Sequence, residues 1–483
     1  MNGKRPWIGD ASVGKDLEGD ISEYDQERDP ESHRESNSEN PTKRGKPDSL
    51  NNGTLPADQE EQEEVFDEVS IPDLSYATGS WQGSKDVNED RYINQSKQLL
   101  GPVFGIFDGH GGTFTAEYLV RNLTRTVRSC WKQKNYSVQS SLENIHRTSC
   151  LERDRSERLK SQMLSLADQI HEINALISQS HGKEQILELE VLRGDLVSTT
   201  EAVQLEINQI DREEKARVDD YYTFVVENES RICDAIRAGF LRTDNNLLQR
   251  QDLKDGSTAL IVWFAGYSTK RLRYFVANAG DCRAVLCRDG KAVPLSIDHK
   301  PDRASEKQRI TQSGGFVGQI AGVTRVYAAA GAGLTLGASK TAIYLSVSRA
   351  FGDIKLKFPS PIVSAEPEIT AFDVEEEDLF IVIACDGIWD VMSNEEVVEI
   401  GLRLFDDPKA ATDAIVKQAY RKKSQDNLTA SIIQFKSRTP QARQAAFALD
   451  KQSKSTEPLH AIGDTIEESS PKNNSDEIDM FTI

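Results

Sequence analysis

Four aspartates lie at the ends of apolar, strand-like runs, and this pattern constrains the chain more than any other: Asp108, Asp281, Asp386 and Asp426. Two of the runs end in Asp-Gly, and each of the other two aspartates directly borders a run. A single Asp-Gly pair usually marks no more than a turn. Carboxylates at the ends of rigid strands, however, can converge on one hard cation, because such a cation takes oxygen ligands. Four such junctions favour a cation site over four unrelated turns.

The length and composition exclude several classes of protein. The 483 residues can bury a sizeable core, and the net charge of −20 argues against nucleic acid, since no basic stripe stands out to neutralise phosphates. No run approaches the ~18 apolar residues that a membrane span needs. The six cysteines show no paired spacing, which is typical of reduced thiols in an intracellular protein. We therefore expect a soluble protein of the cytoplasm, the nucleus or both.

The chain divides into two polar ends and a central domain. Residues 1–70 and 437–483 are poor in large apolar groups, so they cannot offset the entropy lost on ordering, and we expect disordered tails. Residues 76–436 alternate strand-like runs with amphipathic helices, and some of the strands are joined by hairpins. This order predicts one α+β domain.

Residues 137–225 interrupt this domain with a helical insert. Apolar residues recur there in two series on either side of a turn at Gly182, and heptad spacing of this kind predicts an antiparallel coiled-coil hairpin. A helix pair packed on the domain surface is the alternative. The first series is Leu159, Met163, Leu166, Ile170, Ile173 and Ile177, and the second is Leu189, Leu192, Leu196, Thr199, Val203 and Ile210.

Seven short motifs, in order along the chain, resemble those of the metal-dependent type-2C family of serine/threonine protein phosphatases. They are residues 83–90 (GSKDVNED), 107–112 (FDGHGG), 255–259 (DGSTA), 279–284 (AGDCRA), 346–353 (SVSRAFGD), 384–390 (ACDGIWD) and 425–429 (QDNLT). Each motif alone is weak, but seven in order are specific. The resemblance implies an αββα sandwich of two antiparallel sheets flanked by helices, interrupted by the coiled-coil insert.

The resemblance also implies a function and a ligand set. The protein would hydrolyse phosphoserine and phosphothreonine in phosphoprotein substrates by attack of a water that bridges two divalent ions. Asp108 would bridge both ions, the Gly109 carbonyl would complete one shell, and Asp386 and Asp426 would hold the other ion. Three acidic residues would lie close by, two orienting bound waters and the last helping to hold a weaker third ion: Glu89, Asp90 and Asp281.

The identity of the ions and of the catalytic side chains follows from the same comparison. An oxygen-rich set suits Mg²⁺ or Mn²⁺, and seven histidines without a zinc-type pair disfavour zinc. His110 would protonate the leaving oxygen. Lys85 stands where most relatives carry arginine to grip the phosphate. Lysine can neutralise phosphate but orients it less rigidly than a guanidinium does.

Two other functions remain open at this point. The chain could be a catalytically silent member of the family that serves as a coiled-coil binding scaffold, or an adaptor whose phosphatase domain regulates it. Silent members usually lose a metal aspartate, whereas all four are present here. The insert is also a candidate site for a protein partner. A monomer is slightly favoured over a coiled-coil dimer, because the turn at Gly182 lets both apolar series pair within one chain.

Overall fold

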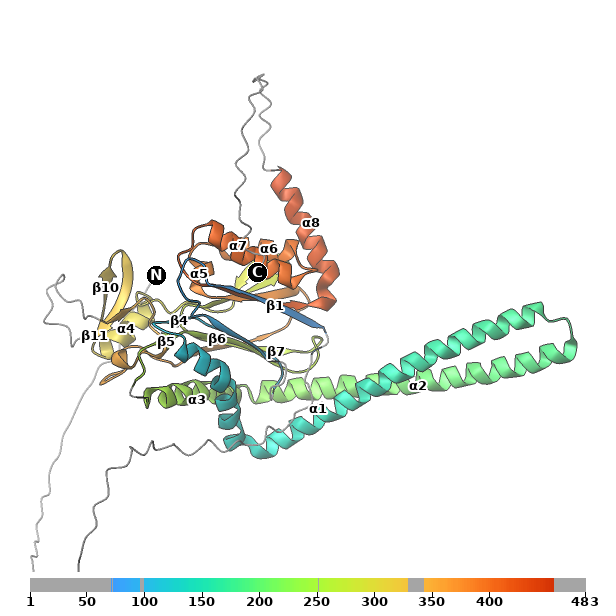
Figure 1. Cartoon of the computed structure of the whole chain (residues 1–483). Helices are drawn as coiled ribbons and strands as arrows, with labels where there is room; N and C mark the ends of the chain where they lie inside the picture. The colour runs from blue at the N-terminus through green and yellow to red at the C-terminus, as the bar shows by residue number, and fades with distance from the viewer. Residues whose placement is uncertain (1–70, 72, 96–99, 251, 329–342, 456–483) are drawn as a thin grey trace, which may run out of the picture. The chain divides into compact units, whose positions relative to one another are not determined.

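The computed structural model describes residues 71, 73–95, 100–250, 252–328 and 343–455. Two five-stranded antiparallel sheets lie at its centre, which confirms the predicted sheet sandwich (Figure 1). The strand order of the first sheet is β1 (Leu74–Trp81), β16 (Leu428–Phe435), β15 (Asp378–Ala384), β8 (Arg283–Arg288) and β9 (Lys291–Pro294). The strand order of the second sheet is β14 (Glu368–Asp373), β7 (Arg273–Ala279), β6 (Ala259–Ala265), β3 (Val103–Phe107) and β2 (Arg91–Gln95).

The central strand β6 explains why the sheets stack. Its side chains alternate between two apolar clusters, because successive residues of a strand point to opposite faces. Leu260, Val262 and Phe264 enter the cluster that also holds the residues of the first sheet. Ile261 and Trp263 enter the cluster formed with the helices on the other face. A strand buried on both faces reads as a continuous apolar run.

Helices cover the outer faces of both sheets. On the first sheet, α7 (Pro408–Arg421) packs on β1 and β16, and α6 (Asn394–Arg403) packs on β8 and β9. On the second sheet, α3 (Glu229–Leu248) and the beginning of α1 share one apolar cluster with β3 and β6. The shorter elements are β4 (Gly109–His110), β5 (Gly256–Ser257), α4 (Ala304–Gln312), β10 (Gly315–Ile320), β11 (Val323–Ala328), β12 (Tyr344–Leu345), β13 (Phe351–Gly352) and α5 (Asp386–Trp389).

The predicted insert lies within two long helices, α1 (Phe114–Gln179) and α2 (Lys183–Glu227), which a short turn joins. Near the sheets, Trp131 and Tyr221 belong to the cluster on the second sheet. Farther along the two helices, Leu166, Val203 and Ile207 form a separate apolar cluster that contains no residue of either sheet. The coiled-coil geometry itself stays a prediction.

Every residue of the first apolar series is partly or fully buried. In the second series, the prediction is wrong for two residues, which are exposed. Leu192 is 49 % exposed, and Thr199 is exposed as well. Ile207 is buried in their place at 3 % exposure. Buried and half-buried positions of α2 are spaced alternately four and three residues apart, at Leu196, Thr200, Val203, Ile207 and Ile210, and Leu192 and Thr199 each lie one residue before a position of this pattern.

The predicted C-terminal tail, residues 437–483, includes a segment that the structure shows as a helix. Residues Thr439–Ser455 form α8, and Ala442 is fully buried against the core of the first sheet. The segment contacts the core through small apolar residues such as Ala442, and its composition is otherwise largely polar. Composition alone therefore predicted a tail. The remaining tail predictions, residues 1–70 and 456–483, lie outside the described residues. Within the described part of the chain, no helix is both long and apolar enough to cross a membrane.

Candidate metal centre

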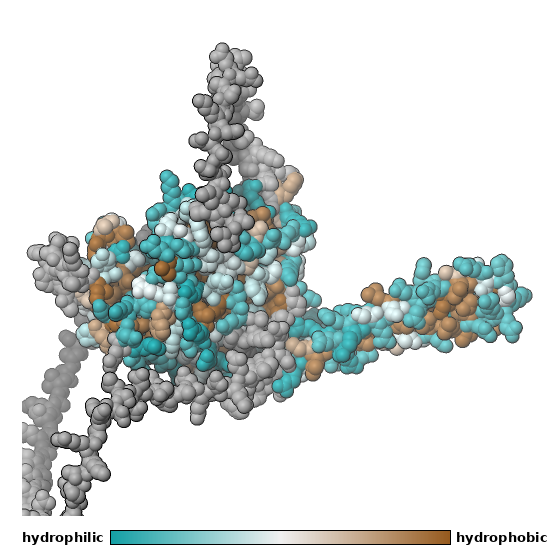
Figure 2. All heavy atoms as spheres, viewed as in Figure 1, coloured by the Kyte–Doolittle hydropathy of each residue, from teal (hydrophilic) through white to brown (hydrophobic). Residues whose placement is uncertain are grey.

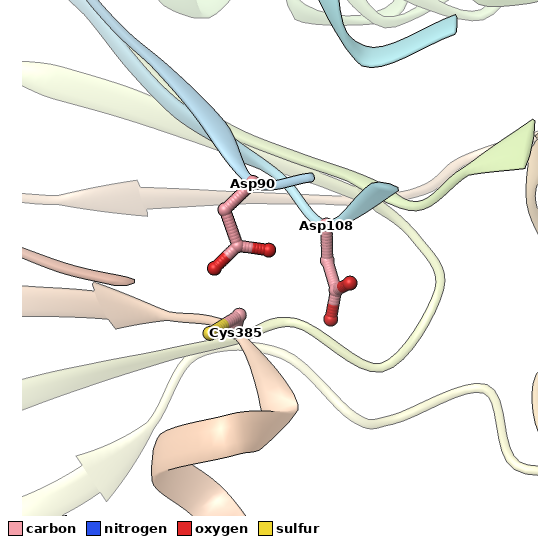
Figure 3. A group of neighbouring side chains, drawn as sticks. All are labelled: Asp90, Asp108 and Cys385. Carbon is pink, nitrogen blue, oxygen red and sulfur yellow. The ribbon is translucent and has the colours of Figure 1, made fainter. Parts of the chain in front are cut away.

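Four of the predicted acidic residues lie close together where strands of the two sheets end, namely Asp90, Asp108, Asp281 and Asp386. Asp108 follows β3, Asp281 lies two residues after β7, and Asp386 begins α5 two residues after the end of β15. One oxygen from each of these three carboxylates lies within 4.8 Å of the others. Asp108 belongs to a second group of the same size, in which it lies with Asp90 and the Cys385 thiol. Figure 3 shows the Asp90 and Asp108 carboxylates pointing toward the same space beside Cys385.

Two glycines allow the loops of the site to approach closely. A Cβ on Gly109 would lie 2.5 Å from the Glu89 carbonyl oxygen. A Cβ on Gly387 would lie 2.0 Å from the Asn427 carbonyl oxygen, beside Asp426. Both distances are too short for any side chain, so glycine is required next to Asp108 and Asp386. The Asp-Gly pairs that first marked the site thus have a packing role.

Asn427 fixes the loop that carries Lys85 and Glu89, a role that the sequence did not indicate. Its amide nitrogen donates to the carbonyl oxygens of Gln82 and Val87, at 2.8 and 2.9 Å. Its side-chain oxygen accepts from the Glu89 backbone N–H at 2.9 Å. The loop is therefore held beside Asp426, the neighbour of Asn427 in the chain.

The carboxylates repel one another strongly. Burial raises the pKa of Asp108 well above its ordinary value, and the charges of Asp386 and Asp90 raise it further. Burial likewise raises the pKa of Asp90 to about 6. Among the described residues, neither carboxylate oxygen of Asp90 has a hydrogen-bond partner of good geometry. Mutually repelling carboxylates, which include these two Asp90 oxygens, fit a hard cation, because a divalent ion would satisfy these oxygens and offset the charge.

Lys300 is part of this cluster, although the sequence did not single it out. Its ammonium group lies 2.5 Å from an oxygen of Asp281 and 3.6 Å from an oxygen of Asp386. Burial lowers the pKa of Lys300, but the charges of these two aspartates outweigh burial, so the net shift is upward. Lys300 is therefore a fixed positive charge on one side of the acidic group.

Lys85 contacts a predicted metal ligand. Its ammonium group lies 2.9 Å from an oxygen of Asp426, and both side chains are about two-fifths exposed (44 % and 41 %). The structure thus places Lys85 beside Asp426, and its predicted contact with the substrate phosphate stays a prediction. It also gives this lysine an ion pair that the sequence did not indicate.

His110 is held by a second residue that sequence reasoning missed. Its Nε2 lies 3.0 Å from both carboxylate oxygens of Asp353. Asp353 has a left-handed backbone with φ of +50°, and a Cβ on Gly256 would lie 2.3 Å from its carboxylate. Burial lowers the pKa of His110, but the Asp353 charge and hydrogen bond outweigh burial and raise it overall.

Cys385, the third member of the second group, is a neutral thiol. It is buried, its sulfur donates to the Asn427 carbonyl oxygen, and it accepts from the Thr429 N–H at 3.2 Å. Burial, with the charges of Asp90 and Asp108, raises the pKa of Cys385 well above its ordinary value. A nucleophilic thiolate needs the opposite surroundings.

Several known proteins have sequences similar to that of this chain. A rice protein called "Probable protein phosphatase 2C 47" (Oryza sativa subsp. japonica) is 37% identical over 240 residues, 47% of this chain and 53% of the relative. The Arabidopsis thaliana "Probable protein phosphatase 2C 59" is 38% identical over 215 residues, 44% of this chain and 60% of the relative. The chain thus spans little more than half the length of these relatives.

A solved structure, the serine-threonine phosphatase 2C from Toxoplasma gondii, aligns with 76% of this chain and 96% of its own, with 20% identity and a TM-score of 0.48. The family model for Protein phosphatase 2C matches residues 165–428, more than half of this chain. The matched residues begin inside α1, so Asp90 and Asp108 precede them. The strand before Asp108, β3, nevertheless pairs with β6, which lies within the matched residues. The chain therefore belongs to the protein phosphatase 2C family.

Proposed function

We propose that this protein hydrolyses phosphoserine and phosphothreonine in phosphoproteins with the help of two divalent ions, Mg²⁺ or Mn²⁺. The observation that carries the proposal is that Asp108 belongs to both groups of neighbouring side chains at the site, one of three carboxylates and one of two carboxylates with the Cys385 thiol. A residue shared by two groups suits a ligand that bridges two ions. The intact acidic set also speaks against a silent scaffold, because such a protein would need no cluster of repelling carboxylates.

Each of the two ions would be held by its own set of residues, with one residue shared. Asp108 would contact both, with the Gly109 carbonyl, Asp386 and Asp426 completing the first shells, and Glu89 and Asp90 would orient water. Bound there, the ions would neutralise the phosphoryl oxygens and lower the pKa of the attacking water. A third ion beside Asp281 would have to compete with the Lys300 ammonium, which supports weaker binding at that position.

The chain's own residues would supply the proton and the grip on the substrate. Asp353 offsets the effect of burial and raises the pKa of His110, which favours the protonated ring, and His110 would give its proton to the serine or threonine oxygen as that oxygen leaves. Asp353 would then hold the His110 ring in position for the next turnover. Lys85 would attract the phosphate with the hydrogen-bond donors that Asp426 does not use.

The test is phosphate release from a phosphothreonine peptide with and without Mn²⁺. We expect turnover with Mn²⁺ or Mg²⁺, loss of turnover on addition of EDTA, and recovery when the metal is returned. Turnover that survives complete chelation would exclude the two-ion proposal. Absence of turnover with either metal would instead favour the binding scaffold.

Replacing Lys85 separates substrate binding from catalysis. Because Lys85 is partly exposed and contacts the edge of the site, we expect Lys85→Ala to raise KM about tenfold while kcat changes less. Lys85→Arg should retain or slightly improve KM, since the guanidinium can form a bidentate contact with phosphate. Steady-state kinetics at saturating Mn²⁺ would measure both constants. If Lys85→Ala changes only the Mn²⁺ concentration needed for activity, Lys85 serves Asp426 rather than the substrate.

The helical insert should be dispensable for chemistry. We expect replacement of residues 155–212 by a short Gly/Ser linker to preserve peptide turnover within a few-fold. The contacts that anchor α1 and α2 to the second sheet lie outside the deleted part, including Trp131, Tyr221 and the Ser149–Tyr267 hydrogen bond of 3.1 Å. Kinetics and thermal unfolding of the shortened protein would measure this. An unfolded product would show that the insert belongs to the core.

We also propose that the insert recruits a protein partner and that the protein is a monomer. The separate apolar cluster of Leu166, Val203 and Ile207 supports the monomer, because α1 and α2 satisfy each other there within one chain. The six cysteines show no paired spacing in the sequence, which supports a location in the cytoplasm or the nucleus, where thiols stay reduced.

A further inference from the structure

One face of α2 carries an uncharged, exposed stripe that lies outside the apolar cluster shared with α1. We call it the outer stripe, and its members recur at helical spacing: Leu187, Val191, Gly194, Ser198, Ala202 and Leu205. Leu187, Val191 and Leu205 are 62 %, 59 % and 68 % exposed. At about 100° per residue the stripe lies nearly opposite the buried series of α2. Figure 2 shows hydrophobic residues gathered along the two helices toward the turn that joins them.

The outer stripe is bordered by acidic residues on both sides. The helical period places Glu188 and Asp195 along one edge and Glu190 and Glu201 along the other. These four side chains are exposed, and none of them takes part in an ion pair among the described residues. Residues 184–206 contain six acidic side chains and one basic one, Arg193. Glu206 forms an ion pair with Arg155 of α1 at 2.6 Å, whereas the four edge residues have no ion-pair partner among the described residues.

Gly194 lies in the middle of the outer stripe, where no other part of the described structure packs closely against it. Glycine is less favourable than alanine inside an exposed helix, because it loses more freedom on folding. A Cβ on Gly194 would meet nothing within 4 Å, so internal packing does not call for a glycine there. A small residue between exposed leucine and valine side chains would, however, let the backbone of another helix come close.

We propose that the outer stripe of α2 docks an amphipathic helix of another protein, with an apolar seam flanked by lysines or arginines. The seam would cover Leu187, Val191 and Leu205, and the basic flanks would meet the acidic edges. A second copy of this chain fits less well, because pairing two outer stripes would bring acidic edge against acidic edge. The proposal does not depend on the phosphatase activity.

The test uses a synthetic helical peptide with leucine at the a and d positions of each heptad and lysine at the flanking e and g positions. The full-length protein is titrated with this peptide and with a matched peptide that carries glutamate at e and g. We expect one lysine peptide to bind per chain, more weakly at high salt, and the glutamate peptide to bind at least about tenfold more weakly.

Matched variants locate the binding face. Val191→Glu combined with Leu205→Glu should weaken the lysine peptide at least about tenfold, because two buried contacts of the seam would become charged. Leu164→Glu, on the exposed face of α1 at 71 % exposure, should bind it as the unmodified protein does. Circular dichroism and peptide turnover should be the same for all three proteins, which separates this proposal from the proposed activity.

Three outcomes would overturn the proposal. The first is no binding of the lysine peptide by the full-length protein. The second is equal weakening by Leu164→Glu and by the double variant, or equal binding of the two peptides. The third is concentration-dependent self-association in light scattering that the double variant abolishes, because the outer stripe would then be covered by a second copy of this chain.

Discussion

Replacing Asp108 with asparagine is expected to lower kcat/KM on a phosphothreonine peptide by more than about 100-fold. Asparagine keeps the shape of the side chain but removes the charge of the one described residue that belongs to both groups of neighbouring side chains at the site. Changing a residue that only orients a metal ligand already costs 10–100-fold in many sites, roughly speaking, so the loss of a bridging ligand should cost more. Initial rates at saturating Mn²⁺ would measure the effect.

The same variant should not be less stable without metal. The charges of Asp386 and Asp90 oppose ionisation of Asp108, so removal of its charge relieves repulsion in the metal-free protein. In EDTA, Asp108→Asn should unfold at or above the temperature of the unmodified protein, whereas Mn²⁺ should raise only the latter strongly. Asp168→Asn, an exposed change on α1, is the matched control and should behave as the unmodified protein in both assays. Normal activity, or full stabilisation of Asp108→Asn by Mn²⁺, would contradict the bridging role.

The parts of the fold that could be predicted are those encoded by neighbouring residues. The run before Asp108 is apolar at every position because β3 is buried on both faces, and the structure has this strand at Val103–Phe107. A strand end followed by Asp-Gly therefore placed Asp108 correctly, and the same reasoning placed Asp386 after β15. The family motifs then supplied the arrangement of the sheets, which no local pattern contains.

The residues that were missed act through contacts between distant parts of the chain. Lys300 reaches Asp281 across 19 residues, and Asp353 reaches His110 across 243 residues. Nothing near Asp353 in the sequence indicates its left-handed backbone, which is normally a position for glycine or asparagine. Asp353 does stand in the SVSRAFGD motif, and an acidic residue in such a motif was the available signal, whereas Lys300 stands in none of the seven motifs.

The predicted heptad positions on α2 were partly wrong for a different reason. Leu192 and Ile207 are both apolar residues of α2, but only Ile207 lies in phase with the buried repeat. The α2 helix has apolar residues on two faces, so composition allows more than one series. Only the position of α1 decides which face is buried. The apolar residues left over from that choice include the outer stripe.

Replacing Asp353 with asparagine should move the loss of activity at high pH to a lower pH. Burial lowers the pKa of His110, and the Asp353 charge reverses that effect. Without the charge, burial dominates, so His110 should lose its proton below the ordinary value of 6.5. A general acid works only while protonated, so activity should fall as pH rises through this lowered pKa. Near pH 8 we expect a loss on the order of 100-fold with a phosphothreonine peptide.

The choice of substrate distinguishes this role from a structural one. An aryl phosphate such as p-nitrophenyl phosphate has a leaving group that needs no proton, so Asp353→Asn and His110→Ala should slow its hydrolysis much less. A variant that merely distorted the site would slow both substrates equally and would leave the midpoint of the pH profile unchanged. Asp302→Asn, an exposed change near Lys300, serves as the control and should leave both profiles as they are. If Asp353→Asn keeps the original midpoint, the proton comes from another group, and His110 is not the acid.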